Sequence, residues 1–174
     1  MICENKECAQ MGERVDLGDH DVAFLCPVHA YLLHPEVTKK FTLEELRQKV
    51  RGIGNSDPGH VYLPPTDEGG DRCSYATSLD RPTQGCLVGQ GLESLGVPRA
   101  FLDLMDHYQN GSGISIESAL ERGLLDPWIE GGVEETFNFP ERKWLYRVQS
   151  AQDGGRMWSQ ALAHADRCEE NEES

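Results

Sequence analysis

Residues 144–165 read WLYRVQSAQDGGRMWSQALAHA, and they carry the clearest helical pattern in the chain. Their apolar side chains recur at the spacing that places them on one face of a helix. Gly154 and Gly155 interrupt the pattern, and two glycines destabilise a helix interior by about 2 kcal/mol relative to alanine. We therefore expect a mainly α protein with either a kinked helix or two consecutive helices here. The residues that mostly share the face are Trp144, Leu145, Val148, Ala151, Trp158, Ala161, Leu162 and Ala165.

A second helix signal lies earlier in the chain, where the sequence FTLEEL begins at Phe41. Thr42 followed three residues later by Glu45 is a capping box, and Phe41 with Leu46 fits the hydrophobic staple around it. This pattern predicts a helix that starts here and runs to about Arg51. The glycine-rich stretch that follows is expected to end it.

The middle of the chain adds shorter helical segments separated by turn-forming residues. Helices are expected over about 86–97, 98–108 and 115–124, with Gly96 and Pro98 marking the first break. The apolar run HVYL at 60–63 is typical of a short edge strand or an extended arm, which leaves room for one short β-hairpin.

The predicted organisation is a helical domain over residues 41–168 with a small appendage at each end. Residues 1–40 form a knuckle of little regular structure, and residues 169–174, EENEES, form an acidic tail. We expect the tail to fray, because negative charges at the C-terminus of a helix oppose its dipole.

The net charge of the chain argues against general binding of nucleic acids. The 174 residues include 30 Asp and Glu against 16 Lys and Arg, so the net charge is -14, and residues 52–135 alone hold 14 acidic and 4 basic side chains. Lys and Arg supply most non-specific affinity for nucleic acids by neutralising phosphates. General nucleic-acid binding is therefore not expected.

Membrane insertion and secretion are not expected either. No apolar run approaches the roughly 18 residues that cross a bilayer, and the first residues, MICE, lack the cationic and apolar start of a signal peptide. We expect a cytoplasmic protein.

The spacing with the most chemical content is Cys3-x4-Cys8, then 17 residues, then Cys26-x2-His29. Two short-spaced ligand pairs joined by such a connector are typical of a tetrahedral zinc site. Since disulfides are rare in the cytoplasm and this segment has little apolar content, the metal would staple the knuckle. Four protein ligands close the coordination sphere, so the sequence predicts a structural zinc site and not a catalytic one.

The ligand set of this zinc site has alternatives. The C-x4-C spacing is looser than C-x2-C, and His20 or His34 could replace His29 as the fourth ligand. The cysteines could also form a disulfide or have roles unrelated to any metal.

Cys86 is the candidate nucleophile. It follows Gly85 at the start of an apolar helix, where free amides and the helix dipole lower the pKa of a thiol. His107 and His60 are the available bases. The commoner reason for a cysteine in the sequence GCLVG is packing of a small side chain, so we expect Cys86 to be buried and inert.

Two further clusters are candidates for partner contacts. Asp103 and Asp106 lie one turn apart on the predicted helix 98–108, and we expect them on an open face that attracts a basic protein.

A basic cluster follows the knuckle, and a local patch of this kind can bind nucleic acid despite the global charge. A solvated helix face is the simpler interpretation. The cluster consists of Lys39, Lys40, Arg47, Lys49 and Arg51.

Four other motifs carry a resemblance. They are RCSY at 72–75, GCLVGQGL at 85–92, LGVP at 95–98 and QDGGRMWSQA at 152–161. Across about residues 60–166 the chain resembles a group of small actinobacterial and bacteriophage proteins without an established activity. The resemblance implies that the protein comes from an actinobacterium or from one of its phages. It implies a location in the cytoplasm, which is that of the host cell if a phage encodes the protein, and it implies nothing about catalysis.

The sequence favours a small acidic, zinc-containing regulatory or host-interaction protein that acts through contacts with a basic protein. A closed metal site, a strongly acidic middle and the lack of a convincing catalytic constellation support this expectation. The alternative is a thiol-dependent enzyme with Cys86 as its nucleophile. A third hypothesis is nucleic-acid binding through the zinc knuckle and the adjacent basic helix.

Overall fold

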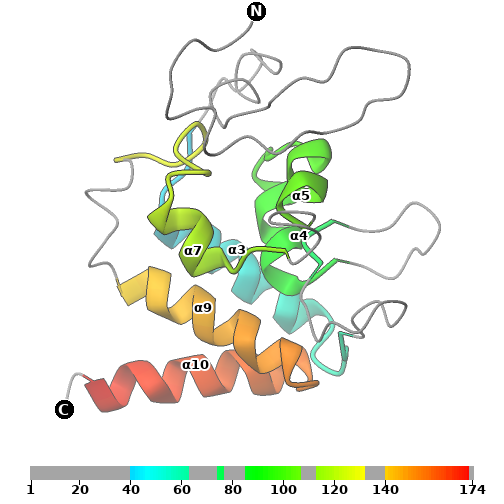
Figure 1. Cartoon of the computed structure of the whole chain (residues 1–174). Helices are drawn as coiled ribbons and strands as arrows, with labels where there is room; N and C mark the ends of the chain where they lie inside the picture. Colours follow the sequence, from blue (N-terminus) through cyan, green and yellow to red (C-terminus); the bar gives the residue numbers. More distant parts are fainter. Residues whose placement is uncertain (1–39, 63–73, 77–84, 107–112, 132–139, 173–174) are drawn as a thin grey trace, which may run out of the picture.

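The computed structural model describes residues 40–62, 74–76, 85–106, 113–131 and 140–172. This part of the chain is mainly helical, as predicted (Figure 1). Its helices are α3 (Leu43–Ser56), α4 (Leu87–Ser94), α5 (Arg99–Asp106), α7 (Ile116–Glu121), α9 (Pro140–Asp153) and α10 (Trp158–Glu172).

The glycine pair separates two helices, which confirms one of the two alternatives expected for residues 144–165. Helix α9 ends before Gly154, and Gly155 takes the left-handed conformation with φ 75°. That conformation carries little penalty for glycine, and it turns the chain back on itself. Helices α9 and α10 then lie side by side (Figure 1).

Helix α3 begins where the capping box predicts but ends later than expected. The Thr42 hydroxyl accepts from the Glu45 amide at 3.1 Å, and the Glu45 carboxylate accepts from the Thr42 amide at 2.8 Å. The predicted end at Arg51 was wrong, because the helix continues to Ser56.

Packing explains why the glycines do not end α3. A Cβ on Gly54 would lie 2.8 Å from Leu162 Cδ1 and 3.1 Å from Leu87 Cδ2, so α10 and α4 approach the backbone of α3 closely at this position. Burial of those leucines outweighs the roughly 1 kcal/mol by which glycine disfavours a helix.

The shorter helices start and stop near the predicted positions. Cys86 caps α4, and Gly96, with φ 93°, lets the chain turn before α5 begins directly after Pro98. The Ser115 hydroxyl caps α7 by accepting from the Ser118 amide at 3.1 Å.

β-Pairing within the described ranges consists of isolated bridges. Phe41 pairs with Ile129 in parallel, and Val61 pairs with Met157 in antiparallel orientation. Of the two alternatives predicted for residues 60–63, the single bridge at Val61 fits an extended arm and not an edge strand, and Leu63 lies outside the described residues. The part of the chain that the structure describes contains no β-hairpin.

The core lies where these helices meet. Trp128, Trp144 and Trp158 are each at most 1% exposed and come from three different parts of the chain.

None of the helices in the described part is long and apolar enough to cross a membrane.

The acidic tail is helical as far as Glu172, so the expectation that it frays there was wrong. Glu169 forms an ion pair with Arg47 of α3, and Glu172 forms one with Arg147 of α9. These contacts place cations beside the carboxylates, which offsets the unfavourable interaction with the dipole of α10.

Candidate functional site

The predicted zinc ligands Cys3, Cys8, Cys26 and His29 lie outside the described residues, as do the alternative ligands His20 and His34. Within the described ranges, no three His, Cys, Asp or Glu side chains gather closely enough to hold a metal ion. The zinc site therefore stays a prediction.

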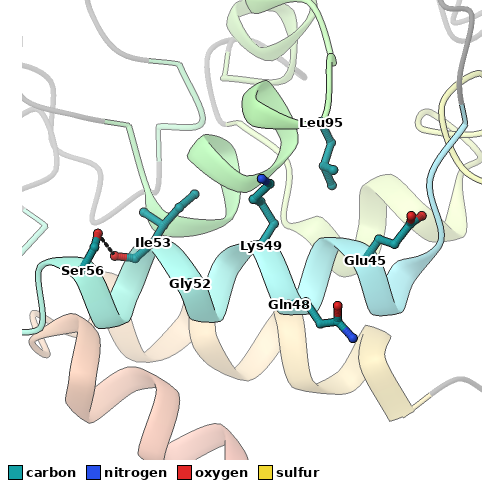
Figure 2. A pocket seen from close by; sticks show the side chains of 7 residues that line it. All are labelled: Glu45, Gln48, Lys49, Gly52, Ile53, Ser56 and Leu95. Carbon is teal, nitrogen blue, oxygen red and sulfur yellow. Dashed lines mark hydrogen bonds between the residues drawn. The ribbon is translucent and has the colours of Figure 1, made fainter.

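An open hollow of about 600 Å³ lies beside α3, near the end of α4 (Figure 2). Lys49 extends from α3 toward α4, and Leu95 points back toward α3 (Figure 2). A Cβ on Gly52 would meet nothing within 4 Å, so this glycine leaves open space above the helix. The lining residues are Glu45, Gln48, Lys49, Gly52, Ile53, Ser56 and Leu95.

Two of the polar side chains that line the hollow make local hydrogen bonds. The Glu45 carboxylate belongs to the capping box, and the Ser56 hydroxyl donates to the Ile53 carbonyl at 2.7 Å. Lys49 adds a single ammonium group. No nucleophile paired with a base is among the residues that line this hollow, and such a pair is what covalent catalysis requires.

Cys86 is buried, as predicted, with none of its surface exposed. Its Sγ accepts from the Gly89 amide at 3.3 Å, which caps α4, and its own amide donates to the Ser74 carbonyl at 2.7 Å. Of the two proposed bases, His107 lies outside the described residues, and His60 stacks on Trp158 with the rings 4.1 Å apart.

Asp103 is exposed, as expected, but the expectation of an open position for Asp106 was wrong. The Asp106 carboxylate accepts from the Tyr75 amide at 2.6 Å, the Ala76 amide at 3.0 Å and the Ser74 hydroxyl at 2.8 Å. Burial raises the pKa of Asp106 above its usual 3.8, although these hydrogen bonds oppose the shift. The side chain thus holds the segment 74–76 in place.

Tyr75 anchors the same segment from the other side. Its hydroxyl donates to the Ile114 carbonyl at 2.8 Å and accepts from Gln149 Nε2 at 2.8 Å. Gln149 Oε1 accepts from the Ile116 amide at the start of α7, and Gln152 Oε1 accepts from the Leu87 amide at the start of α4. Two buried glutamines of α9 therefore satisfy amides at the first turns of two other helices.

The basic cluster does not form a free patch in the described part. Arg47 is held by Glu169, and Arg51 is held by Asp166 at 2.9 Å. Both guanidinium groups also stack on Trp144, at 5.1 Å and 4.7 Å from the ring centre. These arginines join α3 to α9 and α10, so the expectation of a solvated helix face was also wrong for them.

The remaining members of the cluster have different surroundings. Lys40 donates to the Asp126 carbonyl at 2.9 Å, Lys49 lines the hollow, and Lys39 lies outside the described residues. A surface that binds phosphates needs several unengaged cations, and this cluster does not supply them in the described part.

These contacts also lower the pKa of the Asp166 carboxylate. Burial alone would raise its pKa, but hydrogen bonds from Arg51 and Trp144, with the charges of Arg51 and Arg47, lower the pKa below 3.8. The ion pairs therefore favour the charged form of this carboxylate in the folded protein.

One contact between a histidine and a cysteine was not predicted from the sequence. His164 and Cys168 lie one turn apart on α10, with Sγ 4.0 Å from Nε2. Their spacing of four residues on a helix was the available signal.

Comparison with known proteins adds no functional assignment. The chain matches no family model, and neither the curated proteins nor the solved structures contain a significant match to it.

Proposed function

We propose that this chain is a small acidic, zinc-containing regulatory or host-interaction protein that binds a basic protein partner. The observation that carries the proposal is the excess of acidic side chains, which gives a net charge of -14 and attracts a basic surface. Arg47, Arg51, Arg142 and Arg147 are engaged by carboxylates within the fold, so these four cations are not available to an acidic partner.

The structure lends less support to the two other hypotheses. A thiol-dependent enzyme would need access to Cys86, and this residue has no exposed surface. Nucleic-acid binding through the basic helix would need Arg47 and Arg51, and both are engaged in ion pairs. The acidic protein-binding function remains the proposal that these contacts support best.

The electrostatic part of the proposal predicts a salt-dependent interaction. A basic protein partner is first isolated from a host lysate by pull-down with the full chain. The double substitution Glu93→Gln and Asp103→Asn removes two exposed charges, so it should slow association with that partner and flatten the salt dependence of the association rate. Exposed charges are screened beyond about 8 Å at physiological ionic strength, so higher salt should slow the wild-type protein more than the variant. Surface plasmon resonance over a salt series measures both effects.

Ala100→Ser is the matched control, since it changes an exposed residue of α5 without changing charge. It should bind as the wild type does. A partner that associates at the same rate at low and high salt would overturn the electrostatic account.

The zinc component is tested separately. If Cys3, Cys8, Cys26 and His29 bind the metal, the purified chain should hold one zinc ion, and Cys26→Ser should lose it together with structure in the N-terminal region. Atomic absorption measures the zinc and circular dichroism the structure. Cys168→Ser is the control and should keep the metal. Less than about a tenth of an equivalent of zinc, in protein prepared without chelator, would contradict the prediction.

A further inference from the structure

The end of α10, residues 167–172, is held differently from the rest of that helix. The buried side chains of α10 are Trp158, Ala161, Leu162 and Ala165, and all of them precede this end. Residues 167–172 read RCEENE and are half-buried or exposed. Apolar packing therefore anchors the first part of α10, whereas its end contributes no buried side chain to the core.

Two carboxylates of this end contact cations of the neighbouring helices. The Glu169 carboxylate accepts two hydrogen bonds from the Arg47 guanidinium of α3, one of them at 2.8 Å. The Glu172 carboxylate pairs with Arg147 of α9 and lies 3.5 Å from the Lys143 ammonium. The hydrogen bond from Arg147, with the charges of Arg147 and Lys143, lowers the pKa of Glu172 below 4.5, so this carboxylate is charged at neutral pH.

The three cations form one surface, which we call the cationic face and which consists of Arg47, Lys143 and Arg147. The two glutamates that contact it lie one turn apart on α10, so the cations are neighbours as well. Arg47 also stacks on Trp144, at 5.1 Å from the ring centre. Arginine and tryptophan are the residues that most often dominate the affinity of protein–protein interfaces.

We propose that the cationic face binds an acidic helical segment of another protein, and that the end of α10 occupies this face as an intramolecular competitor. In the structure these cations are engaged within the fold, so the partner binds after the end of α10 has moved away. The proposal goes beyond the proposed function, because the partner there is basic.

The present occupant defines the chemistry of this partner. It offers two carboxylates one turn apart on a helix, and both amino groups of the Arg47 guanidinium grip one of them. Three cations are few for binding a phosphate backbone, so an acidic protein segment fits the face better than a nucleic acid does.

The contacts of this end allow it to be displaced. The side chains of Lys143 and Glu172 are 62% and 49% exposed, and ion pairs near the surface contribute little to stability and are screened by salt. Opening beyond Asp166 leaves the buried side chains of α10 and the contact between Asp166 and Arg51 in place. The rest of the fold therefore persists when this end opens.

The double substitution Glu169→Gln and Glu172→Gln weakens the competitor without changing the size of its side chains. The probe is a fluorescein-labelled, alanine-based helical peptide with glutamates one turn apart, and fluorescence anisotropy at low salt measures its binding to the full chain. The double variant should bind this peptide at least about fivefold more tightly than the wild type. Adding Arg147→Gln should abolish the gain.

The matched control is Glu93→Gln with Glu130→Gln, which removes two exposed charges elsewhere on the protein. It should bind the peptide as the wild type does. Thermal unfolding followed by circular dichroism establishes that each variant is folded. If the double variant is unfolded, Glu172→Gln alone replaces it and should also bind the peptide more tightly than the wild type.

Amide hydrogen exchange tests the opening in the wild-type protein. Raising sodium chloride from about 0.02 M to about 0.5 M should accelerate exchange in residues 167–172 severalfold and leave residues 158–165 unchanged. Equal peptide affinities of the double variant and the control would overturn the proposal, as would exchange that does not respond to salt. A gain in affinity for a single-stranded oligonucleotide and not for the peptide would also overturn it, because the face would then fit a nucleic acid.

Discussion

Replacing Gly89 by alanine should lower the free energy of unfolding by about 3 kcal/mol or more. A Cβ at this buried position would lie 2.2 Å from the Tyr75 carbonyl oxygen and 2.6 Å from the Tyr75 Cα. Forcing additional atoms into a packed core usually destabilises by about 1–3 kcal/mol. We expect the upper end of that range or beyond, because the obstructing atoms are backbone atoms that hydrogen bonds hold in place.

Gly52→Ala is the matched control, since it makes the same chemical change on another helix. A Cβ there would meet nothing within 4 Å, so alanine should stabilise the protein by about 0.5–1 kcal/mol through helix propensity and the unfolded state. Urea denaturation of both variants measures the difference. Similar stabilities for the two variants would contradict the close approach of segment 74–76 to α4.

Asp106→Ala should lower the free energy of unfolding by about 2–3 kcal/mol. The substitution removes the acceptor of two backbone amides and one hydroxyl, and unsatisfied buried donors are costly. Asp103→Ala, at an exposed position one turn earlier on α5, should have a much smaller effect. Equal losses in the two variants would mean that Asp106 does not anchor the segment.

The pH dependence offers a second readout for Asp106. Its folded-state pKa is raised above the ordinary 3.8, so the folded protein binds a proton that the unfolded chain has released. The wild-type protein should therefore gain stability relative to Asp106→Asn as pH falls through the folded-state pKa, and the gain is complete below about 3.8. Urea denaturation of both proteins over a pH series measures this difference.

Sequence alone determined the features that depend on near neighbours in the chain. The Thr42 capping box, the Ser115 cap and the turns at Gly96 and Gly155 each involve contacts or dihedral angles within a few residues. Burial of Cys86 was also predictable, because a small side chain between glycines is typical of tight packing. The zinc ligands were proposed from spacing in the same way, and they stay a prediction.

Only the tertiary structure decided which long-range partner each polar side chain has. Arg47 and Glu169 are 122 residues apart, and Arg51 and Asp166 are 115 residues apart, so nothing in the local pattern distinguishes them from solvated surface. The prediction that Asp106 is open to solvent failed for the same reason. Its hydrogen-bond partners lie in a segment about thirty residues earlier in the chain. The length of α3 and the helical tail follow from packing and ion pairs that form only when the helices meet. The free energy of helix propensity is small compared with the free energy gained by burying apolar side chains in such contacts. Tertiary contacts therefore determine the structure at these positions.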